Sequence, residues 1–501
     1  MCKTNSQIAT AIVAALTLTG ISGGAVGVGT AHAASPLPVV ESASEGSTPF
    51  IGDITIADVP QSASTFSFRI EPKPGTFSVP VTAVLTRQYL VQNGYFDDST
   101  TVTIPLFGLY DDYENTVVVT VKSASGRATT LSHELTSSKW SSSCRDTLAG
   151  ATKVVSPSNS VKLDFSFFML KAWACGAHPI VMDIDGNIRW VGTAGGAQQG
   201  STFFQNNFYV GNGSDLYEIT PFGDSRSIGN YSADGYSNFH HNIDPGRDGM
   251  LLEFDRSPDV ESDVIEVGAN GEVLETWDVA DIVRKAMIKG GDDPSAFVRQ
   301  GDDWFHNNAA TYWKQRNQLV LSGREDFVIG IGYDDDKIKW ILGDPDKAWH
   351  NYPSLRAFAL DFPEGTEPPI GQHAVSFTSA GNLMFFNNGY ASFHHSPSGD
   401  SRSTSFPQQF SLNLKKQTAK EVWRFDHSPA LWSPICSSIY QHGTSYLVDY
   451  ASEGGGIRLV GLDKHKNIGF ELKINGSGYD WGWNAYPFDF AGMRFAKSQV
   501  R

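Results

Sequence analysis

Histidine recurs in this sequence at the start of several predicted strands, beside Asn, Gln or Gly. The four segments are Phe239-His-His-Asn242, Asp303-Trp-Phe-His-Asn-Asn308, Gly371-Gln-His-Ala374 and Tyr440-Gln-His-Gly443. An imidazole can attack an electrophile, and it can give or take a proton near neutral pH. If the fold gathers these side chains, the sequence predicts nucleophilic and acid–base chemistry at one site.

The register of two histidines is the same relative to the turn that follows them. His241 lies eight residues before Gly249, and His373 lies eight residues before Gly381. If the two turns are equivalent in a repeated fold, both histidines face one common channel. His240 and His241 are adjacent, and the sequence leaves open which of them faces that channel.

An arginine and an asparagine accompany the histidines. His306 and Asn308 start one predicted strand, and Ser322-Gly-Arg324 ends the next one. A guanidinium keeps its charge and offers a fork of N–H donors that suits sulfate or phosphate oxygens. This set therefore predicts a site for an oxyanion substrate, in which a neutral imidazole can attack sulfur or phosphorus while other imidazoles donate protons.

Composition excludes several other classes of protein. The chain carries a net charge of −16, which repels nucleic acid and anionic membrane surfaces. It has no Gly-x-Ser-x-Gly segment and no phosphate-binding Gly-rich loop of the Walker type. Neither a CxxC pair nor a zinc-type Cys/His spacing occurs, so we expect no metal site and no cofactor.

The elements that must position these residues are repeated hairpins. A strand, a turn with Gly, Asp or Asn, and a second strand recur six times after residue 175, and the second strand often ends in Trp. The copies are Val181–Trp190, Leu216–Ile228, Val264–Trp277, Ile329–Trp340, Phe410–Trp423 and Leu459–Phe470. A second hairpin precedes several copies, which makes four strands per unit and predicts a six-bladed β-propeller. We expect the tryptophans to fill the cores between blades and Val279–Ile288 to form a helix between two of them.

The pattern before the repeats divides the chain into three parts. Residues 1–33 resemble a signal peptide with an Ala31-His-Ala33 cleavage site, which predicts a secreted or periplasmic protein. Residues 34–145 read as a linker and a small all-β domain, with a hairpin around Ser125-Gly126. Residues 146–501 are then the propeller and catalytic domain. Cys144 and Cys175 are candidates for a disulfide across the junction.

These segments together resemble the bacterial arylsulfate sulfotransferases, which need no phosphoadenosine donor. The matching segments are Phe239–Ile243, Asp303–Asn308, Ser322–Glu325 and Gly371–His373, with Phe107–Tyr110 and Asn115–Val117 in the N-terminal domain. The best-known members carry a short disulfide loop before the nucleophilic histidine, whereas residues 360–371 contain no cysteine here.

The resemblance implies a six-bladed propeller behind a small β-domain, in a protein that is often a homodimer. It implies ping-pong transfer of a sulfuryl group from a phenolic sulfate donor to a phenol acceptor. His373 would be the nucleophile that becomes a sulfohistidine, and His306, Asn308 and Arg324 would hold the sulfate. His241, or its neighbour His240, would complete the cluster.

Two alternatives come from other classes of protein. A Gly-turn-Trp repeat also occurs in quinone-dependent dehydrogenase propellers, which would show a fuller tryptophan pattern and the absorbance of a bound cofactor. A non-catalytic binding propeller would show no turnover, and replacing its histidines would change binding little.

Overall fold

The computed structural model describes residues 37–96, 100–172, 176, 179–194, 200–476 and 481–496. The segment from Leu37 onward forms one compact unit. The predicted signal peptide, residues 1–33, lies outside the described residues. So does Cys175, whereas Cys144 forms a disulfide bond. Among the described residues, no helix has the length and apolar character to cross a membrane.

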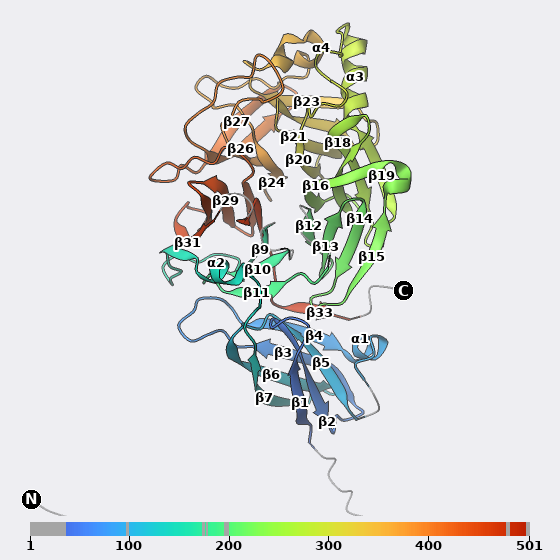
Figure 1. The fold of residues 1–501 in the computed structure, drawn as a ribbon, viewed down its shortest axis with the longest axis vertical. Coiled ribbons are helices and arrows are strands. Elements are labelled where there is room, and N and C mark those ends of the chain that lie inside the picture. The colour runs from blue at the N-terminus through green and yellow to red at the C-terminus, as the bar shows by residue number, and fades with distance from the viewer. Residues whose placement is uncertain are drawn as a thin grey trace, which may run out of the picture. The chain divides into compact units, whose positions relative to one another are not determined.

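The N-terminal part consists of two sheets packed face to face (Figure 1). One sheet has the order β1 (Val39–Glu45), β2 (Ile51–Ala57), β5 (Val102–Phe107). The other has the order β33 (Met493–Phe495), β4 (Val81–Thr86), β3 (Ala63–Ile70), β6 (Tyr113–Ser123), β7 (Ala128–Ser137). Strand β3 shows why these residues form a sheet, because Phe66, Phe68 and Ile70 alternate with polar residues and are buried. The predicted hairpin around Ser125-Gly126 joins β6 to β7.

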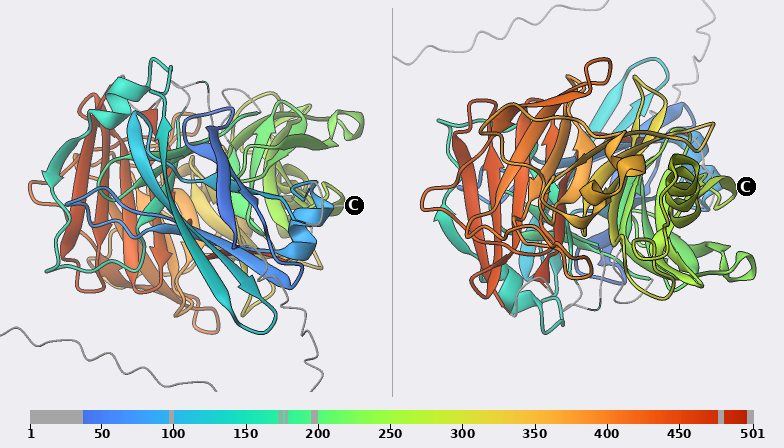
Figure 2. Two further views of the ribbon diagram at one scale, coloured as in Figure 1. Left: turned by 90° about the horizontal axis from the view of Figure 1, so that it is seen from below. Right: turned by 90° about the horizontal axis from the view of Figure 1, so that it is seen from above.

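Six antiparallel sheets follow, five with four strands and one with five, and form the blades of a propeller (Figure 1; seen from below and above in Figure 2). Blade 1 contains β9 (Phe167–Lys171), β10 (Ile180–Asp183), β11 (Ile188–Val191) and β32 (Asn484–Pro487). Blade 2 contains β12 (Ser201–Phe204), β13 (Asn207–Asn212), β14 (Asp215–Ile219) and β15 (Ser225–Asn230). Blade 3 contains β16 (Tyr236–Pro245), β17 (Met250–Arg256), β18 (Asp259–Val267) and β19 (Val273–Asp278).

The remaining blades repeat this order. Blade 4 contains β20 (Asn307–Trp313), β21 (Gln318–Gly323), β22 (Phe327–Gly332) and β23 (Ile338–Gly343). Blade 5 contains β24 (His373–Phe377), β25 (Leu383–Asn387), β26 (Phe406–Asn413) and β27 (Thr418–Arg424). Blade 6 contains β28 (Ser438–His442), β29 (Ser445–Glu453), β30 (Gly456–Leu462) and β31 (Ile468–Asn475), with β8 (Thr152–Val155) on its outer edge.

The helices are short and lie outside the sheets. They are α1 (Arg87–Gln92), α2 (Arg145–Ala149), α3 (Val279–Gly290) and α4 (Pro353–Arg356), with 3-10 turns at Ser232–Asp234 and Ala348–Asn351. The predicted helix at Val279–Ile288 is therefore confirmed as α3. Asp278 caps its first turn by accepting a hydrogen bond from the Asp281 backbone N–H, and Gly291 ends it with a left-handed φ of 92°.

The chain closes the ring by pairing its late and early strands. The late strand β32 pairs with β9 and becomes the innermost strand of blade 1, while β8 pairs with β31 of blade 6. The innermost strands contact their neighbours in the order β12, β16, β20, β24, β28, β32. The chain is thus an all-β protein, a six-bladed β-propeller preceded by a small N-terminal β-domain, as the hairpin repeat predicts.

Tryptophans at the hairpin ends pack between blades. The Trp190 ring stacks on Phe208 of blade 2 at 4.0 Å between centroids, and its indole N–H donates to the Pro221 carbonyl. Trp277 and Trp340 are also buried, whereas Trp423 is half-buried and stacks on Tyr446 of blade 6. Large ring area buried at each junction stabilises the ring of blades.

Candidate functional site

The predicted histidines lie in or directly before three irregular inner strands, His241 in β16, His306 before β20 and His373 in β24. The pairing register shifts between Phe239 and Ile243 in β16, between Asn307 and Ala309 in β20, and between His373 and Ser376 in β24. A β-bulge of this kind turns a side chain away from the regular alternation, and bulges are frequent beside active sites. The fold therefore repeats one backbone device in three consecutive blades.

Strained backbone accompanies each irregularity. His241 has φ +49°, His306 has φ +52°, and Ala374, next to His373, has φ +57°. These are left-handed conformations that residues other than Gly, Asn and Asp rarely adopt. Such strain persists only where surrounding packing enforces it, and it is concentrated at functional sites.

His373 is held as a neutral imidazole with a defined tautomer. Its Nδ1 lies 3.0 Å from the Gly371 carbonyl and 2.9 Å from Asn388 Oδ1. The Asn388 amide nitrogen donates to the carbonyls of Ser433 and Cys436, so its oxygen must face His373 as an acceptor. Nδ1 therefore carries the proton, and Nε2 keeps its lone pair.

Burial and neighbouring charge keep this imidazole unprotonated. Burial, together with the positive charges of Arg324 and His306, lowers the pKa of His373 to about 3. The side chain is thus a neutral nitrogen base across the ordinary pH range.

Arg324 presents unused donors inside the protein. Its side chain is only 2% exposed, and its Nη1 pairs with Glu325. Its Nε and Nη2 are buried without a hydrogen-bond partner among the described residues. Leaving buried N–H donors unpaired costs about 1–3 kcal/mol each, so an oxyanion that accepts from both would relieve a penalty built into the fold.

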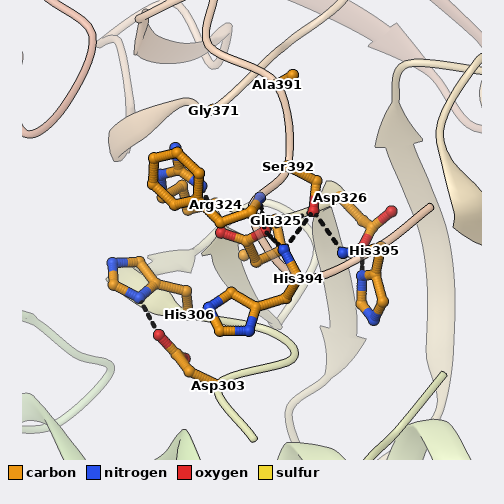
Figure 3. A network of polar contacts seen from close by, with 12 residues as sticks. Asp303, His306, Arg324, Glu325, Asp326, Gly371, Ala391, Ser392, His394 and His395 are labelled. Carbon is orange, nitrogen blue, oxygen red and sulfur yellow. Dashed lines mark hydrogen bonds and ion pairs between the residues drawn. The ribbon is translucent and has the colours of Figure 1, made fainter. Parts of the chain in front are cut away.

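His306 stands beside two carboxylates, and Figure 3 shows the contact to one of them, Asp303. Its Nδ1 lies 2.5 Å from Asp303 Oδ2 and 2.9 Å from Glu261 Oε2. Burial disfavours the imidazolium, but Glu261 and Asp303 outweigh burial and raise the pKa of His306 to about 10. His306 is therefore a proton-carrying imidazolium at neutral pH, in contrast to His373.

Arg324 and His306 are tied together through the backbone. The Arg324 N–H donates to the His306 carbonyl at 3.1 Å, which joins the turn after β21 to the start of β20. The guanidinium and the imidazolium both act on the pKa of His373. Two cations thus lie close enough to a neutral imidazole to act on its charge state.

His240 and His241 are hydrogen-bonded to one another. Their Nδ1 atoms lie 3.1 Å apart, so one of the two nitrogens donates and the other accepts. The His241 ring contacts the His306 ring with centroids 4.8 Å apart, whereas His240 Nδ1 lies 3.8 Å from Glu253 Oε2. His241 therefore faces the charged cluster, and His240 lies behind it.

Asn308 occupies the junction between blades 4 and 5. Its amide nitrogen donates to the Gln372 carbonyl at 2.9 Å, directly before His373. Its Oδ1 is buried without a partner among the described residues. The predicted Asn308 thus reaches the residue directly before His373, and its contact there is to the backbone.

The segment Tyr440–Gly443 does not join this cluster, and the prediction that it opens an inner strand like the others is wrong. His442 is the last residue of β28 and lies 3.2 Å from the exposed Asp489. The strand starts at Ser438, so the histidine falls at its turn end. Tyr440 lies mid-strand, and its hydroxyl hydrogen-bonds Asn484.

Sequence reasoning missed the groups that set the charge and tautomer of the histidines. They are Glu261, Asp303, Glu325 and Asn388. Glu325 follows Arg324 directly, and Asp303 lies three residues before His306, so the sequence positions of both acids point to the site. Glu261 comes from another hairpin of blade 3, and no local pattern marks it.

Two groups of ligand-type side chains have spacings that could also hold a metal ion. They are His240, His241, Glu253 and His241, Glu261, His306, with ligand atoms within 4.8 Å of one another. In the second group, His306 Nδ1 is already hydrogen-bonded to Asp303 and forms an ion pair with Glu261. Proton sharing between these histidines and carboxylates accounts for their spacing, and we assign them this role instead of metal binding.

The fold and the site define a class of protein, a six-bladed β-propeller in which histidines of the inner strands cluster with a buried arginine. Comparison with known proteins makes this specific. The family model Arylsulfotransferase (ASST) matches residues 151–476, and the Arylsulfotransferase Ig-like domain matches residues 55–138. The chain belongs to the arylsulfotransferase family.

Two curated relatives carry the same name, Arylsulfate sulfotransferase AssT. The one from Escherichia coli O6:H1 strain CFT073 is 25% identical over 244 residues, which cover 39% of this chain and 40% of the relative. The one from Lelliottia amnigena is 23% identical over 227 residues, 36% of this chain and 37% of the relative. The matched segments therefore span less than half of either relative.

Solved structures resemble the chain only remotely. A protein of unknown function from Bacteroides thetaiotaomicron has a TM-score of 0.32 and 11% identity, covering 88% of this chain and 99% of its own. BamB from Moraxella catarrhalis has a TM-score of 0.28 and 10% identity, covering 64% and 87%. The dihydro-heme d1 dehydrogenase NirN has a TM-score of 0.30 and 11% identity, covering 83% and 74%.

Proposed function

We propose that this protein transfers a sulfuryl group from a phenolic sulfate ester to a phenol by a ping-pong mechanism. In the first half-reaction, His373 Nε2 attacks sulfur, an N–S bond forms, and the ester O–S bond breaks. The phenolate leaves with a proton. In the second half-reaction a phenol oxygen attacks the sulfohistidine, the N–S bond breaks, and the phenol proton returns to the enzyme.

The single observation that carries this proposal is a neutral His373 beside the unpaired donors of Arg324. A lone pair on Nε2 is what attack on sulfur requires, and two unpaired N–H groups are what sulfate oxygens require. A sulfate placed on Arg324 would bring its sulfur next to the nucleophile. The negative charge that builds up in the transition state would then meet a permanent cation.

His306 supplies the proton in this mechanism. A phenolate is a poor leaving group because its conjugate acid has a pKa of about 10. The pKa of His306 is also raised to about 10, so proton transfer between the two is nearly balanced. His241 contacts the same cluster and orients the sulfate, while Asn308 holds the backbone before His373. We place the reaction outside the cytoplasm, with residues 1–33 removed and residues 146–501 as the catalytic domain.

The experiment is incubation with 4-nitrophenyl sulfate, without acceptor and then with phenol, followed by intact mass. Donor alone should add one sulfuryl group of about 80 Da to the protein by the logic of a covalent intermediate, and phenol should remove it. The adduct should map to His373. His373→Ala should abolish adduct and turnover, whereas His306→Ala should slow both.

The two alternative functions predict different results in the same experiment. A binding propeller gives no adduct with any aryl sulfate. A quinone-dependent dehydrogenase shows cofactor absorbance and no sulfuryl transfer. An adduct on another residue, or turnover by His373→Ala, would refute the assignment of the nucleophile.

A further inference from the structure

A loop from blade 5 crosses to the arginine of blade 4. It connects β25 to β26, and its residues 392–394 converge on one carboxylate (Figure 3). Glu325 Oε2 accepts hydrogen bonds from Ser392 Oγ, from the Phe393 N–H at 2.6 Å and from the His394 N–H at 3.0 Å. The other oxygen of the same carboxylate pairs with Arg324. Glu325 therefore fixes the loop and the guanidinium relative to one another.

Two further ion pairs hold the loop on either side of this point. His394 Nδ1 lies 2.7 Å from Asp302, and the buried His395 pairs with the buried Asp326. The Arg299 side chain donates to the His394 carbonyl at 2.7 Å. So many polar anchors over so few residues give Phe393, at the centre of the loop, a defined position.

Phe393 is held partly in solvent over the catalytic arginine. The Arg324 guanidinium carbon lies 3.6 Å from the centroid of its ring, yet the residue is 58% exposed. Tyr390 packs edge-on against Phe393 at 5.1 Å, and Trp432 packs edge-on against Tyr390 at 6.0 Å. These three half-buried or exposed rings form an aromatic surface beside the anion-binding donors.

This arrangement has a physical price that a ligand would offset. Apolar ring surface left in water forgoes the free energy of burial, about 25 cal/mol per Å². Contact with Arg324 accounts for the covered part of the Phe393 ring, but packing within the protein does not account for the part that is left in water. A planar apolar group that carries an anion next to it would cover the rings and reach Arg324 together.

We propose that Phe393, Tyr390 and Trp432 form the subsite for the aromatic ring of the substrate, used by the donor and then by the acceptor. The inference rests on the proposed function, since an aryl sulfate is an aromatic ring joined to an anion through one oxygen. A ring at this surface would place that oxygen toward Arg324. Because donor and acceptor are bound in turn, one subsite serves both.

The test compares two acceptors that compete for the same sulfohistidine. Phenol is one, and hexafluoroisopropanol, a non-aromatic alcohol of similar acidity, is the other. The ratio of the two sulfated products depends only on the second half-reaction. Any effect of a Phe393 variant on Arg324 that changes the rate of the first half-reaction therefore cancels in this ratio. Wild-type protein should favour phenol. Phe393→Ala should lower the phenol preference by roughly 2- to 13-fold, as expected for loss of one aromatic pair.

Matched variants separate the ring from its surroundings. Phe393→Tyr keeps the ring and should keep the ratio, whereas Phe393→Leu keeps apolar area and should lose most of the preference. Phe77→Ala removes a phenylalanine that is 42% exposed in the N-terminal part and should leave the ratio unchanged.

The outcomes distinguish this inference from the proposed function. If wild-type protein forms no sulfuryl adduct, the proposed function fails. If the adduct forms but Phe393→Ala leaves the product ratio unchanged, the assignment of the aryl subsite is overturned while the transfer mechanism stands. The same holds if Phe393→Leu retains the full wild-type preference.

Discussion

Glu261 should control the alkaline limit of sulfuryl transfer through His306. The carboxylate oxygen lies 2.9 Å from His306 Nδ1. At an effective dielectric constant of about 20, two unit charges at that distance attract by about 6 kcal/mol, equivalent to about four pKa units. That attraction is large enough to overcome the burial of His306, and it accounts for a raised pKa of about 10.

The expected result follows from the sign of this shift. A raised pKa means that the imidazolium, and the activity that needs it, persists at neutral pH and is lost as pH rises through about 10. Glu261→Gln should move that loss toward the ordinary histidine value of about 6.5. Asp303 remains in the variant, so the donor half-reaction at pH 8 should slow by roughly 3- to 30-fold, the larger figure corresponding to loss of the entire shift.

The assay measures the burst of 4-nitrophenol released from 4-nitrophenyl sulfate without acceptor, in reactions run at pH 6 to 10. Every sample is quenched at the same alkaline pH, so that the product is read in one ionisation state. Phenyl sulfate, followed by intact mass, should show a larger effect because its leaving group needs the proton more. Asp334→Asn is a matched control, since Asp334 is exposed and pairs with Arg247 instead of His306. The reasoning is refuted if the alkaline limb of Glu261→Gln coincides with that of wild type, or if the rate falls equally at pH 6 and pH 9.

Four further predictions concern single groups. Arg324→Ala should lose most transfer and Arg324→Lys should be intermediate, because lysine keeps the charge without the fork; equal steady-state rates in all three would exclude the role. Asn388→Asp should raise the pKa of His373 and create an acid limb near neutral pH, whereas wild type, with His373 at about 3, should show none from this group above pH 5 in the burst assay. Trp190→Ala should reduce the free energy of unfolding in urea by about 3–5 kcal/mol, since the ring is fully buried; a loss below 1 kcal/mol would contradict its packing role. Dialysis against EDTA should leave the burst unchanged, and restoration of a lost burst by added metal would reverse our assignment of the His240–Glu253 and His241–Glu261 groups.

The fold was predictable from sequence because each blade repeats a local signal. Strand alternation and turn glycines are recognisable within a dozen residues. The tryptophan near the end of β11 and of β19, and the one in the middle of β23, mark the junctions that they fill. The register relative to Gly249 and Gly381 predicted that His241 and His373 face one channel. Both lie on inner strands, but His373 starts β24, whereas His241 lies in the middle of β16. The same reasoning failed for His442, because a histidine before a glycine turn can stand at either end of a strand.

The charge state of the site was not predictable from local pattern. Glu261 belongs to β18, the third strand of blade 3, and its left-handed φ of 43° accompanies its approach to His306. Asn388 fixes the tautomer of His373 from the end of the neighbouring strand, 15 residues away. Phe393 sits in a loop whose course depends on Glu325 of another blade. These contacts form only when the blades close into a ring. The residues involved lie too far apart in the sequence for a local pattern to reveal them.

The late pairing of β32 with β9 has a consequence for biosynthesis. During translation, more than 290 residues are added between the end of β11 and the start of β32. Five blades can therefore form while the β9 edge that pairs with β32 still lacks its partner. An unpaired strand edge invites pairing with another chain. The nascent protein therefore stays vulnerable to aggregation until translation is nearly complete, and a premature stop before residue 484 would leave both an open ring and, without β33, an N-terminal sheet lacking its edge strand.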